Sequence, residues 1–312
     1  MQPVMLPFND YGRTMRQRLG GRIQKIAIDA AMSCPNRDGT IAHGGCTFCL
    51  NEAFSPTYCR TAKSLTEQIE QGIAFHSSRS RTAEYYIAYL QSGTNTHADI
   101  HKLRDIYFEV VSHPEISGLI VGTRPDCISS EILDLLADIS TRKYVAVEYG
   151  IESTLDTTLS HVNRGHGFAV AQRAVAQTKE RNIDVGAHFI LGLPGESREH
   201  LTNQVSAINS LHIDFVKFHQ LQIYRSTPMA DEWLNHPERF ALGNISADEY
   251  IDLIVDIIRH LDPSIAIERF ASLAPRHLLL HSPLGGVRID TLRELIIQRM
   301  STLGATQGDL TK

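Results

Sequence analysis

The 312-residue sequence contains no apolar run long enough to cross a membrane. A spanning helix needs about 18 or more consecutive apolar residues, whereas the best candidate, YIDLIVDIIRHL (250–261), includes two aspartates. The N-terminal residues, MQPVMLPFNDYGR, also lack the apolar stretch of a signal peptide. We therefore expect a cytoplasmic protein that has no membrane partner.

An excess of positive charge and a phosphate-binding loop are missing as well. The 30 Lys and Arg residues are outnumbered by 35 Asp and Glu residues, which gives a formal net charge of −5 at pH 7. This balance excludes the overall basic character of many nucleic-acid-binding proteins, although it leaves room for a local basic patch. Neither GxGxxG nor GxxxxGK followed by Ser or Thr occurs, so the two common nucleotide-phosphate loops are absent.

Cysteine is scarce, with five residues in the chain, yet three of them fall within CPNRDGTIAHGGCTFC (34–49). In a reducing cytoplasm such a group more often binds metal or performs chemistry than forms a disulfide. Three thiolates are one ligand short of a tetrahedral zinc site, which His43 would complete. A [4Fe–4S] cluster held by three cysteines instead leaves one iron open for a chelating cofactor. Both sites remain open at this point, and Cys59 and Cys127 are expected to be small buried side chains.

Short apolar segments alternate with amphipathic helical segments over about 200 residues. Most of the apolar segments are continuous, as expected for strands buried on both faces of a parallel sheet. The alternation predicts an α/β fold in which right-handed crossover helices join parallel strands. Six strand–helix units are too few for a complete eight-stranded barrel, so the pattern predicts either a partial barrel or an open doubly wound sheet. The predicted strands are 22–29, 85–90, 118–123, 144–149, 184–192 and 214–221.

The pattern changes after about residue 228. The segment SADEYIDLIVDIIRHL (246–261) opens with Ser246 and Glu249 in capping-box spacing, and its apolar residues form one helical stripe. IDTLRELIIQRMSTL (289–303) predicts a second helix. We therefore predict three regions, namely an N-terminal basic segment (1–21), an α/β core (22–228) and a mostly helical C-terminal extension (229–312).

The cysteines belong to a longer pattern, IDAAMSCPNRDGT (28–40) and GGCTFCLNEAFSP (44–56), which resembles the radical S-adenosylmethionine (SAM) superfamily. Most members space their cysteines as CxxxCxxC, whereas this chain has eleven residues in the first gap. The long gap resembles the YhcC/YtqA-type group, which is similar to the Elongator catalytic subunit and the methylthiotransferases. Further motifs of the resemblance follow in order, all but NRGH at or just beyond predicted strand ends. They are LQSGTNT (90–96), GTRPDC (122–127), VEYGIES (147–153), NRGH (163–166) and HFILGLPGE (188–196).

The resemblance covers nearly the whole chain and implies a partial (β/α)6 TIM-like barrel of the radical SAM type as the core (22–228). It implies that Cys34, Cys46 and Cys49 hold a [4Fe–4S] cluster whose open iron binds SAM. Reductive cleavage of SAM then yields a 5′-deoxyadenosyl radical. A flavodoxin- or ferredoxin-like protein would donate the electron.

The resemblance also implies where SAM binds. The loop after 85–90 would receive its amino group, Arg164 would pair with its carboxylate, and Glu148 or Glu152 would accept from its ribose hydroxyls. Glycines at these strand ends would let the backbone approach the cofactor closely. His188, on the fifth predicted strand, is expected either to face the substrate cavity or to lie hydrogen-bonded in the core. The expected cofactor-binding residues are Ser92, Gly93, Thr94, Glu148, Glu152, Arg164, Gly192 and Gly195.

The sequence constrains the identity of the substrate less than it constrains the type of reaction. The relatives implied by the resemblance include proteins that act on tRNA, at the side chain of the wobble uridine, so tRNA is one expected partner. The segment GRTMRQRLGGRIQK (12–25) has no acidic residue. If the substrate is RNA, we expect this segment to supply the phosphate contacts that position the RNA over the barrel mouth. A small-molecule or peptide substrate remains an alternative, as does a zinc-stabilised protein that binds without catalysis. The basic residues of the segment are Arg13, Arg16, Arg18, Arg22 and Lys25.

Overall fold

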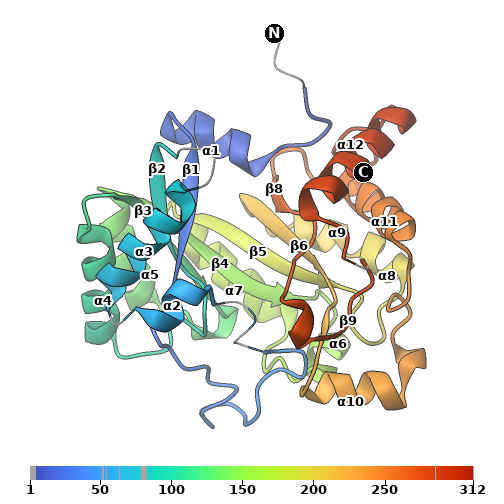
Figure 1. Ribbon diagram of the computed structural model, residues 1–312, viewed down its shortest axis with the longest axis horizontal. Helices are drawn as coiled ribbons and strands as arrows, with labels where there is room; N and C mark the ends of the chain where they lie inside the picture. The colour runs from blue at the N-terminus through green and yellow to red at the C-terminus, as the bar shows by residue number, and fades with distance from the viewer. Residues whose placement is uncertain are drawn as a thin grey trace.

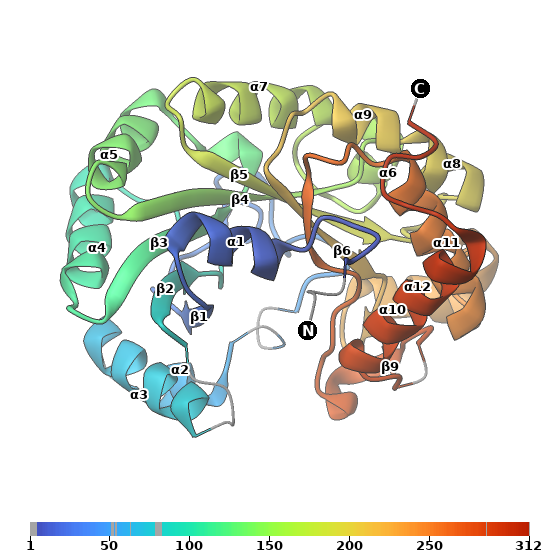
Figure 2. The same ribbon diagram turned by 90° about the horizontal axis from the view of Figure 1, so that it is seen from above.

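The structure is a computed structural model that describes residues 5–50, 53, 55–62, 64–78, 83–284 and 286–311. Seven parallel strands form one curled sheet in the order β1-β2-β3-β4-β5-β6-β8 (Figure 1, Figure 2). The first six confirm the predicted strands, and the curl identifies a partial barrel, not an open doubly wound sheet. The strands are β1 (Ile23–Ile28), β2 (Tyr85–Leu90), β3 (Ile116–Thr123), β4 (Tyr144–Glu152), β5 (Asp184–Leu191), β6 (Phe215–Gln220) and β8 (Ala266–Arg269).

Helices cover the convex face of the sheet, and its concave face points inward (Figure 2). Their apolar stripes pack against outward-facing strand residues such as Leu119 and Val147 to form the main core. Ser64, Asp99 and Ser129 each begin a helix by accepting a hydrogen bond from a backbone N–H in its first turn, which pairs an otherwise free donor. The outer helices are α3 (Leu65–Ser77), α4 (Ile100–Ser112), α5 (Ser130–Ser140), α7 (Phe168–Lys179), α8 (Arg198–Asn203), α9 (Val205–Asn209) and α11 (Ala247–His260).

The C-terminal extension is mostly helical, but it also adds the seventh strand of the barrel. β8 pairs with β6, and its sequence, AIER, has only two apolar residues, so no apolar run signals it. α11 and α12 (Ile289–Leu303) confirm the two predicted helices. None of the helices in the described part of the chain is long and apolar enough to span a membrane. The smaller elements are α2 (Thr57–Thr61), α6 (Asp156–His161), α10 (Pro228–Asn235) and the antiparallel pair β7 (Ile223–Tyr224) and β9 (Leu279–His281).

The amino-terminal helix α1 (Tyr11–Leu19) closes one end of the barrel. Tyr11 and Met15 are buried against inward-facing strand residues such as Phe215. Figure 1 shows α1 above the sheet, whereas the cysteine-rich loop that follows β1 leaves the sheet at the opposite end. The reason is topological, because parallel strands all start at one edge of a sheet and the chain before β1 must lie at that edge.

The basic segment 12–25 therefore begins at the end of the barrel opposite the mouth (Figure 1), which contradicts its predicted role in positioning RNA over the mouth. Arg18 pairs with Asp184, the first residue of β5, with 2.5 Å between Nη1 and Oδ2. Lys25 points into the barrel and pairs with two carboxylates there, at 2.8 and 2.5 Å. Part of the basic segment thus stabilises the base of the barrel.

Candidate active site

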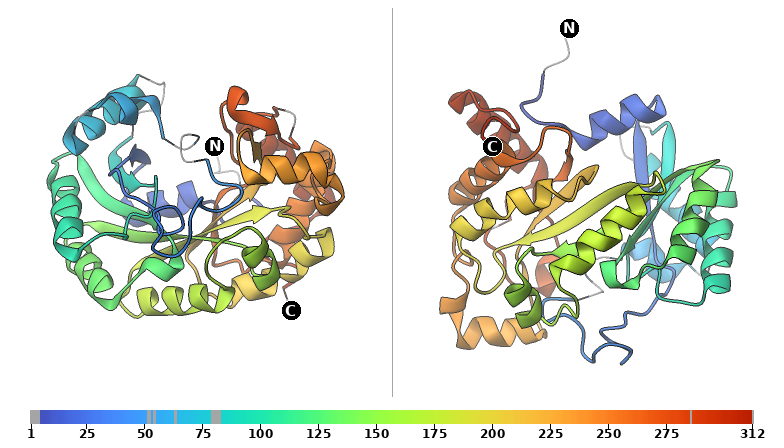
Figure 3. Two further views of the ribbon diagram at one scale, coloured as in Figure 1. Left: turned by 90° about the horizontal axis from the view of Figure 1, so that it is seen from below. Right: turned by 180° about the vertical axis from the view of Figure 1, so that it is seen from behind.

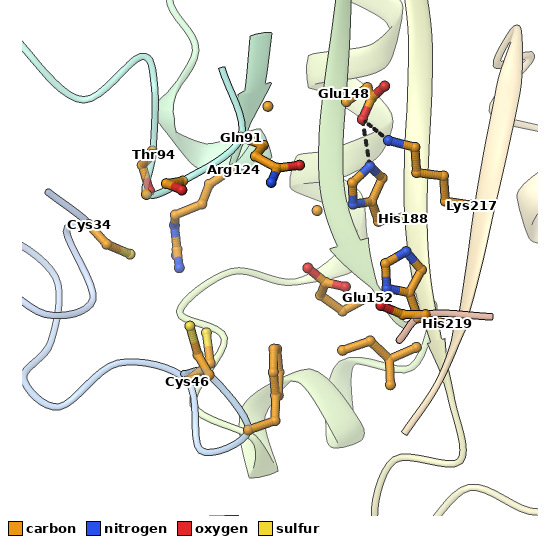
Figure 4. A pocket seen from close by; sticks show the side chains of 18 of the residues that line it. Cys34, Cys46, Gln91, Thr94, Arg124, Glu148, Glu152, His188, Lys217 and His219 are labelled. Atoms are coloured by element: carbon orange, nitrogen blue, oxygen red, sulfur yellow. Dashed lines mark hydrogen bonds and ion pairs between the residues drawn. The ribbon is translucent and has the colours of Figure 1, made fainter. Parts of the chain in front are cut away.

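A cavity opens at the carboxyl ends of the strands, where parallel α/β folds place their sites. The cysteine-rich loop crosses this end of the sheet (Figure 3, left). Of the eleven site residues predicted from the sequence, nine line the cavity, namely three cysteines and six cofactor-binding residues. Figure 4 shows the cysteines on one side and a group of charged and imidazole side chains on the other. The lining includes Cys34, Cys46, Cys49, Ser92, Gly93, Thr94, Arg124, Glu148, Glu152, Arg164, His188, Lys217, His219 and Arg269.

Two tight turns shape the cysteine-rich loop. The N–H groups of Arg37 and Asp38 donate to Cys34 O at 2.7 and 3.0 Å. The N–H of Cys49 donates to Cys46 O at 3.0 Å. Cys46 is buried and the other two are partly exposed. Three thiols therefore face one space from two separate turns of the loop.

The thiols fit a cluster better than a single metal ion. Sulfur ligands of one zinc ion converge to about 2.3 Å from the same point, and no three His, Cys, Asp or Glu side chains in the described ranges converge in that way. His43, the predicted fourth zinc ligand, is exposed, packs over Gly39 and does not line the cavity. A cubane cluster instead takes each thiolate at a different iron, so its cysteines share a cavity without converging on one point.

Cys46 receives two side-chain donors. Asn36 Nδ2 and Arg164 Nη1 each lie 3.5 Å from Cys46 Sγ. Such donors stabilise a thiolate and influence the reduction potential of a cluster bound to it. Burial alone lowers the pKa of Arg164, but the negative charges of Cys46 and Glu152 raise it above its usual range, so the guanidinium stays charged.

The NRGH segment (163–166) anchors the cysteine-rich loop to the barrel. Asn163 Nδ2 donates to Gly45 O at 2.8 Å, and the N–H of Thr47 donates to Val162 O at 3.0 Å. Arg164, in this segment, also donates to Gly150 O at the end of β4. The cysteine-rich loop, the NRGH segment and the end of β4 thus form one connected unit.

Arg124, just after β3, supports the same unit. It donates to both carboxylate oxygens of Asp126, at 2.9 and 2.8 Å, and to Arg164 O at 2.7 Å. Arg124 Nη1 and Arg164 Nε are buried and have no partner among the residues described. Buried donors are nearly always paired, so these two nitrogens are suited to hold an acceptor of a bound ligand.

The loop after β2 is fixed against the chain just before Cys34. Gly93 has a φ of +75°, and an added Cβ would lie 2.3 Å from Met32 O, so only glycine fits here. The N–H of Thr94 donates to Ser33 O at 3.0 Å. The predicted cofactor loop, with Ser92, therefore lines the cavity beside the first cysteine.

A bulge at the end of β4 aims Glu152 into the cavity. The pairing with β5 shifts register between Gly150 and Glu152, and Glu152 has a φ of +73°, a conformation that is uncommon for residues other than glycine. Its nearest charged neighbour is Arg164, with 3.7 Å between Nη2 and Oε1. Glu152 therefore keeps most of its capacity to accept hydrogen bonds.

Glu148, by contrast, is buried inside the barrel between two lysines and a histidine. It is 1% exposed, and Lys25, Lys217 and His188 approach its oxygens at 2.8, 2.6 and 2.8 Å. Burial alone raises its pKa, but the charges of Lys217 and Lys25 hold the pKa of Glu148 well below its usual range. His188 both lines the cavity and bonds to Glu148, so it meets both expectations for it (Figure 4).

The sequence motifs omit part of this network. Lys217 and His219 lie on β6, and Glu268 and Arg269 lie on β8. Lys217 is 2% exposed and interrupts the apolar run DFVKFHQL; a charge in an apolar strand is the same signal that singles out Glu148. β8 offers no comparable signal.

Two of the predicted cofactor residues lie elsewhere. Gly192 and Gly195 have φ of +95° and +84°, but neither lines the cavity. Gly192 packs against Leu242, and Gly195 lines a separate surface depression. Cys59 and Cys127 do not line the cavity either. Both are partly exposed and not fully buried as predicted, although partial burial still raises the pKa of their thiols to about 11 and about 12.

Comparison with known proteins gives matches over most of the chain. A model described as the radical SAM superfamily matches residues 38–204, and one described as the radical SAM C-terminal domain matches 213–302. Cys46 and Cys49 lie inside the first match, and Cys34 lies just before it. Protein YhcC of Escherichia coli (strain K12) is 36% identical over 87% of this chain and 85% of its own length. YtqA of Bacillus subtilis (strain 168) is 32% identical over 94% and 89%.

More distant similarity extends to proteins of larger size. A tRNA uridine(34) acetyltransferase of Methanocaldococcus infernus is 28% identical over 60% of this chain and 34% of its own length. The solved structure of the archaeal Methanocaldococcus infernus Elp3 superimposes with a TM-score of 0.65 at 18% identity, covering 91% of this chain. The present chain spans 64% of that Elp3 chain. The match shows a shared fold.

Proposed function

The chain belongs to the radical SAM superfamily of enzymes, and from this we propose that it cleaves SAM reductively at a [4Fe–4S] cluster held by Cys34, Cys46 and Cys49. The observation that carries the proposal is that the three cysteines share one cavity with the Gly93 loop and Glu152. When bound, such a cluster supplies the electron that breaks a carbon–sulfur bond of SAM and yields a 5′-deoxyadenosyl radical. The surrounding barrel excludes water from the reactive species.

The side chains around the cysteines have distinct roles in this proposal. The loop from Ser92 to Thr94 binds the amino group of SAM. Arg164 and Arg124 offer unpaired buried donors for its carboxylate. Of the two predicted ribose acceptors, Glu152 is favoured, because Glu148 already pairs with Lys25, Lys217 and His188.

The proposed substrate is a tRNA wobble uridine, modified through the radical. The support is the partial similarity to a tRNA uridine(34) acetyltransferase. The basic segment 12–25 does not support an RNA substrate, because α1 lies at the closed end of the barrel. A radical SAM enzyme that acts on a small molecule or peptide is the second candidate. Either reaction needs a reductant, for which a flavodoxin- or ferredoxin-like partner is proposed.

The cluster chemistry is tested on protein purified without air. We expect about four irons and four sulfides for each chain, and 5′-deoxyadenosine and methionine after reduction in the presence of SAM. Colourless protein that holds one zinc ion, or methyl transfer in place of 5′-deoxyadenosine formation, would contradict the proposal.

The substrate is tested separately, by nucleoside analysis of tRNA from cells with and without the protein. Loss of a modified uridine from position 34 is the expected result. Identical nucleoside profiles, combined with confirmed SAM cleavage, would favour the small-molecule or peptide substrate.

A further inference from the structure

The end of β8 carries a bulge that brings two neighbouring charged residues into the barrel. Val216 pairs with Ile267, but the next residue, Lys217, pairs with Arg269, so Glu268 is extra. In a regular strand Glu268 and Arg269 would point to opposite faces, and bulges next to active sites commonly redirect a side chain. Here Glu268 pairs with Lys217 inside the barrel, and Arg269 lines the cavity.

Arg269 has no acidic partner. It makes no hydrogen bond or ion pair with any residue that the structure describes. The nearby carboxylates are already used, since Lys25 and Lys217 each pair with both Glu148 and Glu268. Two carboxylates against the three cations Lys25, Lys217 and Arg269 leave one positive charge on this side of the cavity.

His219, two residues after Lys217 on β6, adds a second unpaired group. Its ring stacks on that of His188, with 5.6 Å between centroids, and its Nε2 atom is buried without a partner among the residues described. Burial, together with the charges of His188 and Arg269, holds the pKa of His219 well below its usual range. The imidazole is therefore neutral and has one N–H to donate.

The chain after Arg269 is held in place by β6. Gln220 and Ser272 exchange two hydrogen bonds, from Ser272 N–H to Gln220 Oε1 at 2.8 Å and from Gln220 Nε2 to Ser272 O at 2.7 Å. Gln222 Nε2 donates to the same carbonyl at 3.2 Å. Arg269 thus projects from a segment fixed at both ends, as a preorganised binding group should.

We propose that Arg269 and His219 form an oxyanion-binding subsite for a carboxylate or phosphate group of the substrate. A guanidinium binds both groups well because it presents parallel donors. The subsite lies across the cavity from the cysteines; Figure 4 shows His219 and Lys217 opposite Cys34. This inference rests on the proposed function, in that it assigns the cysteine side to SAM and this side to the substrate.

The test titrates inorganic phosphate and acetate separately into anaerobically reconstituted protein with SAM bound, at constant ionic strength, and follows binding by calorimetry. Saturable binding of one probe is expected, and the stronger probe identifies the group as phosphate or carboxylate. Arg269→Gln should weaken binding about tenfold or more, and Arg269→Lys, which keeps the charge, should weaken it less. Arg13→Gln, at an exposed arginine of α1, is the control and should bind like the wild type.

The proposal is overturned if neither probe binds saturably to the wild type, or if Arg269→Gln binds as well as the wild type does. Iron content is measured on the same samples. Normal iron with no anion binding refutes the subsite alone. Protein without iron refutes the proposed function, while the same anion titration performed without SAM still decides the subsite, because anion binding there requires neither the cluster nor turnover. Arg269→Lys keeps the comparison available if the glutamine variant folds poorly.

Discussion

Glu148 and its partners show how single residues combine stability with function at the base of this cavity. A carboxylate buried in a barrel is costly unless cations and hydrogen-bond donors surround it. Lys25 and Lys217 satisfy that requirement from β1 and β6. Because Lys25 also pairs with Glu268 on β8, the network links the two edge strands, β1 and β8, that do not pair with each other.

Glu148→Gln should therefore destabilise the fold strongly. The substitution leaves Lys25 and Lys217 with one carboxylate, Glu268, and we expect a decrease of about 3–5 kcal/mol in the free energy of unfolding, as for other broken buried pairs. Urea titration measures it. Asp138→Asn, which removes an exposed pair between Asp138 on α5 and Arg142 just after it, is the matched control and should change stability by less than about 1 kcal/mol. Equal effects of the two variants would contradict this account of the network.

The pH dependence of stability gives a second prediction, from Glu196. Burial raises its pKa to about 7, above the usual 4.5, so folding favours the protonated carboxyl. Its contribution is fully present below about pH 4.5 and is lost as the pH rises through about 7. The free energy of unfolding should fall by about 2 kcal/mol more between pH 5 and pH 8 in the wild type than in Glu196→Gln. Parallel curves for the two proteins would show that this carboxyl titrates normally.

The proposed cluster ligands give a third prediction. Removal of Cys34, Cys46 or Cys49 leaves two thiolates to hold the [4Fe–4S] cluster, so each Cys→Ala variant should lose most of its iron. Cys59→Ala and Cys127→Ala should keep it, because neither residue lines the cavity. Iron analysis after anaerobic reconstitution decides the assignment. Iron loss in Cys59→Ala as complete as in Cys46→Ala would refute it.

Residues of the cavity differ in how far the sequence predicts them. The cysteines, Ser92 to Thr94 and Glu152 follow strands that have clear apolar patterns, so their meeting at one sheet edge follows from parallel topology. Arg269 could not be predicted in this way, since its direction depends on a bulge and on a strand with no apolar run. Gly192 and Gly195 belong to the predicted motif HFILGLPGE (188–196). A motif fixes the position of its residues along the chain, but it does not fix their distance from the cavity.

Among the elements of the fold, the loop after β2 shows most directly how backbone conformation determines the proposed cofactor binding. Gly93→Ala would bring a methyl group 2.3 Å from Met32 O and should push the loop away from the chain that leads into Cys34. We expect weaker SAM binding and partial loss of iron. Gly44→Ala, in the cysteine-rich loop, is the matched control, because its φ of +83° is similar but no atom lies within 4 Å of the added Cβ.

Both alanine variants carry the same backbone strain, of about 1 kcal/mol for a non-glycine residue in this conformation. A difference between them therefore reports the steric contact alone. SAM binding by calorimetry and iron analysis are the measurements. If Gly44→Ala weakens SAM binding as much as Gly93→Ala, backbone strain accounts for both, and the close approach at Gly93 is not what positions the cofactor loop.

For the whole molecule, the two ends of the barrel differ in kind. α1 fills the amino-terminal end with apolar side chains, while the carboxyl end holds the cysteines and the open cavity. The basic character of 12–25 is visible in the sequence, but which end it occupies depends on strand direction. A macromolecular substrate must approach the carboxyl end, so basic residues matter for binding only if they lie there.

This polarity leads to a prediction for RNA binding. Arg225 directly follows β7 and Arg276 lies just before β9; both are exposed and neither forms an ion pair with a described residue. Tyr224, next to Arg225, lines the cavity, and it pairs with Leu279 of β9, so both arginines flank the strand pair beside the cavity. Replacing both with alanine should lower the slope of log affinity against log salt by about 0.7–0.9 for each phosphate that is no longer neutralised. The weakening should be the same for all tRNAs, because phosphates carry no base identity.

The matched control replaces the exposed α1 arginines, Arg13 and Arg16, at the closed end. That variant should bind tRNA with wild-type affinity and salt slope, since the helix faces away from the cavity. Titration of labelled tRNA at several salt concentrations compares the three proteins. A lower slope for the α1 variant alone would place RNA at the amino-terminal end and break the link between RNA binding and the cavity. Unchanged slopes in both variants, with SAM cleavage intact, would favour a small-molecule or peptide substrate, which reaches the cavity without binding through phosphates.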